Sequence, residues 1–380
     1  TQGSRNKPVH SGSPAASNSP VNPSPVVSPT NVHTPRPTVT KTPINTTPTP
    51  HPTPKPTQPP TPRPTPQPTQ PTPTPTQPPT PTPGTTLYTF TGHSKGIRVL
   101  QWSPDGSRIA TGSNDYTAKV WGSTNGSNVV TYTGHTWYVE GIAWSPNGSQ
   151  IASGSADTTV QIWNPNSAAH SYTYTGHSLW VNRVSWSPNG QYIVSCEQAS
   201  KTGYVVQARV WDAATGNTPV VYTGHTNGIF SVAWSPDGTR IASCGYDGTL
   251  QIWEAMTGNH IATFNAGVFL YGLSWSPDST HVVVGGGSTY FWVIDAGTGN
   301  SSSRYNVNAN GVSDAGWSPD GTRIVAGTGG QGAQIFDYAT GAKTYTYNQS
   351  GSLDGIGWSP NNQMVASGDG ATGVVQVWQA

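Results

Sequence analysis

The stretch GHTWYVEGIAWSPNGSQIASGSADTTVQIW, residues 134–163, decides the fold of this chain. Short runs in which apolar and polar residues alternate, such as the run that ends at Trp144, are separated by the turn Pro146-Asn147-Gly148. Alternation with a period of two, broken by Pro-Asn-Gly or Pro-Asp-Gly, predicts antiparallel strands joined by hairpins. A fourth alternating run, residues 171–175, precedes the next Gly-His pair. The stretch therefore predicts a four-stranded antiparallel sheet.

Residues 85–380 repeat this pattern at a regular period. The tripeptide Trp-Ser-Pro recurs at intervals of 41 to 48 residues, beginning at Trp102, Trp144, Trp186, Trp234, Trp275, Trp317 and Trp358. Such a period is typical of repeat architectures. One small sheet cannot bury both of its faces, so the repeats must stack on one another.

The composition of the chain changes near Gly84. Residues 1–84 hold 27 of the 36 prolines and six Lys or Arg, with no aromatic and no acidic residue. Residues 85–380 hold all the aromatic residues, 16 acidic and 11 basic side chains. The first segment carries a net charge of +6 and has too little apolar surface to fold, whereas the second carries −5. We predict two domains, a stalk over residues 1–84 and a repeat domain over residues 85–380.

Alternation of Thr or Gln with Pro in the stalk favours an extended polyproline II conformation. Ser and Thr beside Pro are also typical of O-glycosylated stalks. The candidate sugar acceptors are Asn45, Thr47, Thr49, Thr53, Thr61, Thr65, Thr72 and Thr74. A polyproline ligand for a grooved partner and a plain flexible spacer are the alternatives.

The repeats resemble those of the WD-repeat β-propeller family. The resemblance is carried by the Trp-Ser-Pro-Asp-Gly turns, by the dipeptide Trp211-Asp212 and by four Gly-His dipeptides: Gly92-His93, Gly134-His135, Gly176-His177 and Gly224-His225. It covers residues 85–380 and implies an all-β fold, a seven-bladed β-propeller. The stalk looks like the Pro/Thr-rich stalks of bacterial surface proteins.

The two ends of the repeat domain predict how the ring closes. The last repeat ends at Ala380 and supplies only three strands. Residues 87–93 match residues 129–135 position by position, and the latter precede the second repeat. We therefore expect residues 87–91 to complete the seventh sheet and the stalk to leave from the circumference.

Three repeats share a set of four residues at equal spacing. The sets are His93, Thr111, Asp115 and Trp121; His135, Ser153, Asp157 and Trp163; and His225, Ser243, Asp247 and Trp253. Each set contains a Ser or Thr, a His and an Asp, which are the residue types of a nucleophilic catalytic triad. An active site is needed once, however, and the resemblance implies a hydrogen-bonded structural tetrad in each blade. We interpret the sets as structural and assign no catalytic residue.

The other repeats depart from this set. The third has Val205 where Asp is expected, and the last three replace His by Ala266, Asn308 and Gln349. Ile294 and Phe336 replace the Trp in the fifth and sixth repeats. We expect the C-terminal half of the ring to rely on apolar packing and to be its softer side.

Aromatic residues near the Gly-His dipeptides are the candidate binding residues. They are Trp137, Tyr138, Trp180, Phe269 and Tyr271, together with Tyr204 in the six extra residues of the third repeat. The resemblance places them on the family's usual docking surface, where they are suited to a sugar or a partner protein. The alternative is that these rings only fill the mouth of the channel.

These observations favour a non-enzymatic extracellular scaffold, a propeller head on a stalk, which self-associates into a filament when the cationic tail binds a neighbouring acidic propeller. The alternative is a recognition head, the sensor ectodomain of a bacterial surface protein. Two cysteines and scattered His residues predict no metal site and no cofactor. The negative charge of residues 85–380 argues against nucleic acid. The sequence contains no apolar run long enough to span a membrane.

Overall fold

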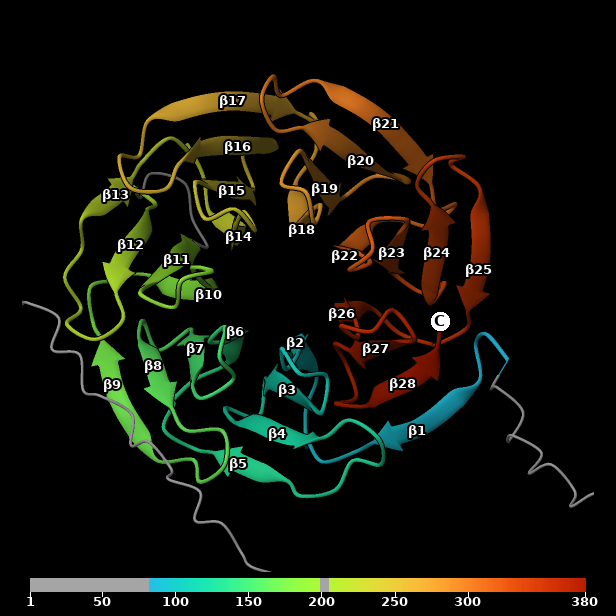
Figure 1. Cartoon of the computed structure of the whole chain (residues 1–380), viewed down its shortest axis with the longest axis horizontal. Helices are drawn as coiled ribbons and strands as arrows, with labels where there is room; N and C mark the ends of the chain where they lie inside the picture. The colour runs from blue at the N-terminus through green and yellow to red at the C-terminus, as the bar shows by residue number, and fades with distance from the viewer. Residues whose placement is uncertain (1–81, 199–204) are drawn as a thin grey trace, which may run out of the picture. The chain divides into compact units, whose positions relative to one another are not determined.

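The structure is a computed structural model that describes residues 82–198 and 205–380. The repeat domain is a ring of seven four-stranded antiparallel sheets, here called blades one to seven (Figure 1). This confirms the predicted all-β, seven-bladed propeller. The stalk up to residue 81, all the candidate sugar acceptors and Tyr204 lie outside the described residues.

Each blade runs from an inner strand beside the channel to an outer strand at the circumference. Blades one to three are β2 (Ile97–Trp102), β3 (Arg108–Ser113), β4 (Ala118–Gly122), β5 (Val130–Tyr132); β6 (Val139–Trp144), β7 (Ile151–Ser155), β8 (Val160–Trp163), β9 (His170–Tyr174); and β10 (Trp180–Trp186), β11 (Tyr192–Gln198), β12 (Ala208–Asp212), β13 (Val220–Tyr222). Blades four to six are β14 (Ile229–Trp234), β15 (Arg240–Gly245), β16 (Thr249–Glu254), β17 (His260–Asn265); β18 (Leu270–Trp275), β19 (His281–Gly286), β20 (Tyr290–Asp295), β21 (Ser301–Asn306); and β22 (Val312–Trp317), β23 (Arg323–Thr328), β24 (Ala333–Asp337), β25 (Lys343–Tyr347). Blade seven is β26 (Leu353–Trp358), β27 (Met364–Asp369), β28 (Val375–Gln379) and, as its outer strand, β1 (Thr86–Phe90).

The Trp-Ser-Pro turn connects the first two strands of each blade. In blade two, Asn147 Oδ1 accepts hydrogen bonds from Ser145 Oγ at 2.8 Å and from Ser149 N at 3.0 Å. Gly148 lies at φ +68°, which glycine adopts without strain. The turn signature is therefore a local cause of the hairpin.

The N-terminal strand closes the ring. β1 pairs with β28 in antiparallel register, with Thr89 opposite Gln376, and Gly84 N donates to Gln379 O at 2.6 Å. The side chain of Phe90 then stacks on Trp121 of blade one, with 3.8 Å between the ring centroids. The predicted closure is thereby confirmed, one residue earlier than residues 87–91 (Figure 1).

Neighbouring blades are joined by aromatic stacks. The outer-strand Tyr of one blade lies flat on the Trp of the next, as Tyr132 does on Trp163 with 4.7 Å between centroids and 1° between planes. The same stack forms between Tyr174 and Trp211, Tyr222 and Trp253, and Tyr347 and Trp378. The apolar clusters of the core likewise contain residues of two adjacent blades, so stability is shared between blades.

Candidate functional site

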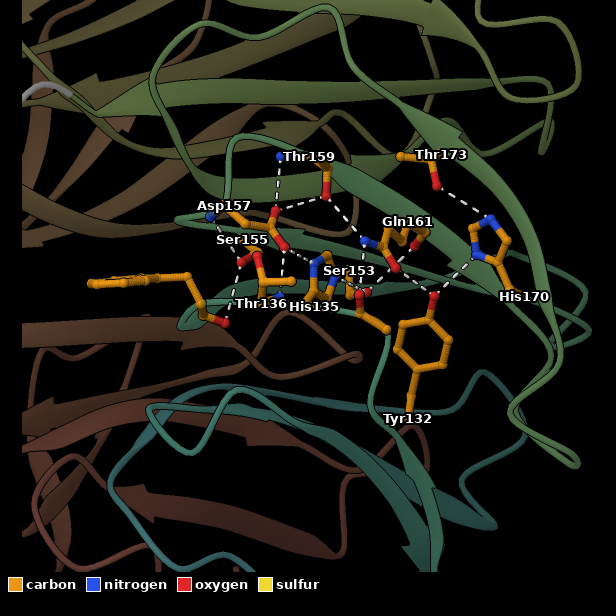
Figure 2. Close-up of polar contacts among 12 residues, drawn as sticks. Tyr132, His135, Thr136, Ser153, Ser155, Asp157, Thr159, Gln161, His170 and Thr173 are labelled. Atoms are coloured by element: carbon orange, nitrogen blue, oxygen red, sulfur yellow. Dashed lines mark hydrogen bonds and ion pairs between the residues drawn. The ribbon is translucent and has the colours of Figure 1, made fainter.

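Three members of the four-residue set of blade two, His135, Ser153 and Asp157, form a hydrogen-bonded chain across its strands (Figure 2). His135 Nδ1 lies 2.9 Å from Asp157 Oδ2, and His135 Nε2 lies 2.8 Å from Ser153 Oγ. Trp163 Nε1 donates to Ser153 Oγ at 3.0 Å. Because an ionised carboxylate only accepts, Nδ1 carries the imidazole proton and Nε2 accepts from the serine. We call this arrangement the strut.

Blades one and four repeat the strut with one difference. In blade four, His225 lies 2.8 Å from both Asp247 and Ser243, and Trp253 donates to Ser243 at 3.1 Å. In blade one, His93 lies 2.9 Å from Asp115 and 2.7 Å from Thr111. Trp121, however, donates to the hydroxyl of Tyr88 at 3.2 Å and not to Thr111. The closing strand β1 therefore supplies a member of this network that the sequence pattern does not include.

Blade three contains a complete strut, which corrects the expectation that Val205 leaves it without an acid. Glu197 Oε1 lies 3.1 Å from His177 Nδ1, while Ser195 bridges His177 at 2.6 Å and Trp211 at 3.0 Å. Glu197 lies on β11, two residues after Ser195, whereas Asp157 lies four residues after Ser153. The glutamate is one methylene longer and reaches the imidazole from this position.

Blades five to seven lack the complete strut and are stabilised by other contacts. Blade seven keeps a partial strut, in which Ser367 donates to Gln349 Oε1 at 2.5 Å and Trp378 donates to Ser367 at 3.1 Å. In blade six, Phe336 packs against two rings of blade five, Phe291 at 5.1 Å and Tyr305 at 5.7 Å between centroids. That this side of the ring is softer stays a prediction.

The strut is poorly placed for catalysis. The side chains of His135 and His225 are fully buried, and Ser153 is 0% exposed, so a substrate has no route to the hydroxyl. Burial lowers the pKa of His93, which keeps the imidazole neutral beside its carboxylate. Burial alone would raise the pKa of Asp247, but hydrogen bonds from His225 and Thr249 lower it to about 2. These groups already satisfy one another.

The candidate site lies instead around the channel, at one equivalent position in every blade. The residue four places before each Trp-Ser-Pro tryptophan is, in blade order, Arg98, Glu140, Asn182, Phe230, Tyr271, Ser313 and Asp354. All of them line one cavity of about 370 Å³, together with Trp180 and others. We call this cavity the channel mouth. All seven inner strands shift register around this position, as β6 does between Val139 and Gly141.

One side of the channel mouth is charged. Arg98 Nη1 donates to Asp354 Oδ2 at 3.0 Å, and Arg98 Nε lies 3.3 Å from Glu140 Oε2. Burial lowers the pKa of Arg98, but the charges of Glu140 and Asp354 more than offset this and hold the pKa above its usual value. Arg183 donates to the main-chain oxygens of Arg98, at 3.2 Å, and of Glu140. A single guanidinium is therefore shared by two carboxylates.

The other side is aromatic. Phe230 lies 4.2 Å from Tyr246 and 5.1 Å from Tyr271 between centroids, and Phe269 lies 5.1 Å from Tyr246. Burial raises the pKa of Tyr246. Trp180 is 39% exposed and lines the same cavity. The mouth thus offers apolar ring faces opposite ionised groups.

The predicted binding residues divide between two places. Trp180 and Tyr271 line the channel mouth, and Phe269 packs against Tyr246 in its wall. Trp137 and Tyr138 form a separate cluster, in which Trp137 stacks on Tyr116 at 5.9 Å and contacts Tyr138 at 5.7 Å between centroids.

Sequence reasoning missed most of the mouth: Arg98, Glu140, Asn182, Phe230, Ser313 and Asp354. A signal for them was present in the sequence. When the seven repeats are aligned on their Trp-Ser-Pro turns, the position four residues before the tryptophan carries a different residue in each repeat. The sequence does not reveal that this position faces the channel.

A second hollow, of about 470 Å³, opens near the other ends of the inner strands and is lined by Trp102, Trp317, Trp358 and Asp314. Burial raises the pKa of Asp314 to about 6, although two main-chain N–H groups donate to its carboxylate.

Cys196 and Cys244 are buried free thiols, and burial raises the pKa of Cys196 to about 12. In the part of the chain that the structure describes, no group of His, Cys, Asp and Glu is arranged to hold a metal ion. No helix within residues 82–198 and 205–380 is long and apolar enough to cross a membrane.

Comparison with known proteins gives one family. The family model described as WD domain, G-beta repeat matches residues 84–122, 126–164, 169–205, 216–254 and 341–379, more than half of the chain. The unmatched stretch between residues 254 and 341 contains blade five and the first three strands of blade six, the two blades whose strut Trp is replaced by Ile294 and Phe336. No curated protein matches the chain.

Proposed function

The chain belongs to the WD40 repeat family, and on that premise we propose that it is a non-enzymatic scaffold whose channel mouth binds a protein partner. One observation carries this proposal: seven equivalent positions around the channel bear seven different side chains, whereas the turns and struts repeat. We call the turns and struts together the frame. Because the frame stabilises every blade in the same way, it is expected to use the same residues in each blade. A surface that recognises one ligand needs a different residue in each, because the ligand lacks sevenfold symmetry.

The chemistry of the mouth suits a protein ligand. Exposed aromatic rings supply large apolar contact area, and Trp, Tyr and Arg are the residues that dominate protein interfaces. Trp180 is 39% and Phe269 is 50% exposed; Trp180 lines the same cavity as Arg98, and Phe269 packs on Tyr246 in the wall of that cavity. Such a surface combines an apolar anchor with charges that set orientation.

We further propose that the propeller is displayed outside the cell on the Pro/Thr-rich stalk, that the stalk carries sugars, and that the scaffold self-associates through it. The abundance of Ser, Thr and Pro in residues 1–84 supports this. Intact mass spectrometry of the natural protein should give a mass above that of the bare sequence, in increments of hexose or N-acetylhexosamine. Brief protease treatment of intact cells should release the propeller. An unmodified mass and a chain protected from protease would contradict this part.

A photo-crosslinking amino acid placed in the full chain tests the scaffold itself. It replaces Trp180 in the mouth or, as a control of similar exposure, Val221 at the circumference, where the side chain is 44% exposed. We expect a protein adduct from position 180 and little from position 221. Equal yields from both positions, or no adduct from either, would refute a partner site at the mouth.

A sensor head for a small ligand is the second candidate. The cavity of about 370 Å³ lies within the range of small-molecule pockets, about 300–1,000 Å³. In that case Trp180→Ala would abolish ligand binding without unfolding the protein, and position 180 would give no protein adduct.

A further inference from the structure

The channel mouth contains a carboxylate with spare capacity to accept hydrogen bonds. The side chain of Glu140 is only 8% exposed, and its contact is the ion pair at 3.3 Å with Arg98 Nε. Arg98 Nε lies 3.3 Å from Glu140 Oε2 but is itself buried without a partner in hydrogen-bond geometry, so this contact is a weak one for the carboxylate. An ionised carboxylate accepts up to four hydrogen bonds. A cationic donor from outside would therefore find an acceptor here.

Of the two guanidiniums that line the mouth, only that of Arg98 contacts the two carboxylates. Arg98 is shared between Glu140 and Asp354, while the guanidinium of Arg183 is engaged with main-chain oxygens. The two carboxylates therefore share one guanidinium as a direct partner, and a cationic side chain of a ligand would be a second.

The aromatic residues of the channel mouth indicate which groups should flank the cation in a ligand. Trp180, Phe230 and Tyr271 line the same cavity as Glu140. Aromatic grooves bind proline-rich segments, whose rings pack on the aromatic faces at low entropic cost, and guanidinium groups stack on such faces. The matching ligand is a Lys or Arg flanked by prolines.

The chain itself contains this ligand three times. Thr-Pro-Arg-Pro-Thr occupies residues 34–38 and 61–65, and Thr-Pro-Lys-Pro-Thr occupies residues 53–57. Residues 65–69 read Thr-Pro-Gln-Pro-Thr, the same motif without the charge. Opposite net charges of the tail and the propeller favour their encounter.

We propose that the channel mouth binds the Thr-Pro-Arg/Lys-Pro-Thr motifs of the tail, and that this contact links separate copies of the chain. A chain has three motifs and one mouth, so two motifs stay free for other copies even if one folds back. The contact is heterologous and therefore propagates unless it closes into a ring. This inference rests on the proposed function and names the partner at the same site.

The first test measures peptide binding. Full-length protein with Arg36→Gln, Lys55→Gln and Arg63→Gln, whose own motifs are neutral, is titrated into a labelled peptide of residues 57–65. We expect saturable binding that weakens at high salt. An Arg63→Gln peptide should bind about tenfold more weakly or worse, since a hydrogen bond to a charged group is lost. Equal binding of the two peptides, or no binding at millimolar protein, would overturn the proposal.

Variants of the mouth locate the contact. Adding Glu140→Gln or Trp180→Ala to that protein should weaken peptide binding about tenfold, whereas Val221→Ala at the circumference should not. Trp180 is exposed, so its variant stays informative if Glu140→Gln fails to fold. Unchanged affinity in the Trp180 variant would place the peptide elsewhere and refute the proposal.

The second test asks whether the contact joins copies. Sedimentation velocity of the wild-type chain should show species that grow with concentration, and the triple Gln variant should stay monomeric. A wild-type chain that stays monomeric at high concentration would overturn the link between copies. If the peptide fails to bind while the crosslinker at position 180 captures another protein, this inference fails and the proposed function stands. If both experiments fail, the proposed function falls as well.

Discussion

The strut is formed in blades one to four, and the channel mouth takes one equivalent residue from each of the seven blades, but the two regions differ in how far their residues repeat. At the strut, His135 and His225 stand in nearly the same surroundings, with carboxylates at 2.9 and 2.8 Å and serines at 2.8 Å. At the mouth, Glu140 and Phe230 stand at one equivalent position and share no chemistry. Repetition therefore marks the residues that stabilise each blade, and divergence marks those to which we assign ligand recognition in our proposal.

The largest effect that separates the two regions is expected from tryptophan truncation. Trp253 is 0% exposed and stacks on Tyr222, so Trp253→Ala should lower the free energy of unfolding by about 3–5 kcal/mol. Trp180→Ala, at an exposed mouth position, should change it by no more than about 0.5 kcal/mol. Urea unfolding followed by circular dichroism measures both. Similar losses would mean that the mouth is part of the frame.

Removal of a smaller strut member should cost less. Ser153→Ala leaves the buried donor of Trp163 and the buried ring of His135 without their shared partner, at a cost of about 1–3 kcal/mol. Ser313→Ala in the mouth is the matched control and should cost less, because Ser313 is only partly buried. The same unfolding assay compares them. A larger loss at Ser313 would reverse the assignment of the two regions.

Acid should erase the contribution of a strut carboxylate. The pKa of Asp247 is lowered to about 2 in the fold, below the value of about 3.9 expected for an unfolded chain. Its ionised form therefore stabilises the fold above about pH 4, and this stability is lost as the pH falls towards 2. The difference in unfolding free energy between wild type and Asp247→Asn should shrink over that window. A difference that is constant with pH would contradict the strut.

The channel carboxylate Asp314 should show the opposite sign. Its pKa is raised to about 6, so the fold binds a proton that the unfolded chain has lost between about pH 4 and 6. Wild-type stability should therefore fall relative to Asp314→Asn as the pH rises through that window and level off above it. Unfolding curves at pH 4, 5, 6 and 7 test this. Parallel pH profiles would show that Asp314 titrates normally.

Much of the frame follows from sequence because it depends on local, repeated chemistry. The Trp-Ser-Pro turns predict the hairpins, and the match of residues 87–93 to residues 129–135 predicts how β1 closes the ring. Glu197 was not predicted because it lies two residues before the position where the other struts have Asp. Its longer side chain nevertheless reaches the histidine and accepts the same hydrogen bond. Tyr88 was not predicted because its contact with Trp121 depends on the closed ring.

The mouth was harder to predict for a physical reason. Its residues come from seven strands far apart in sequence, at a position where strand register shifts and simple alternation fails, as at Arg98 between Ile97 and Val99. Only the closed ring brings Arg98, Glu140 and Asp354 within ion-pair distance. The exposed aromatics Trp180 and Tyr271 were visible in the sequence, but not the charges that face them.

The central claim is that the frame determines stability and the channel mouth determines partner binding. One experiment measures both properties in the same variants. A photo-crosslinking residue at position 269 is combined with Ser153→Ala or with Trp180→Ala in the full chain, and unfolding free energy and adduct yield are measured for each. We predict that Ser153→Ala lowers stability and leaves the adduct of the folded protein unchanged, while Trp180→Ala keeps stability and loses the adduct. Stability and adduct yield that fall together in both variants would contradict the claim.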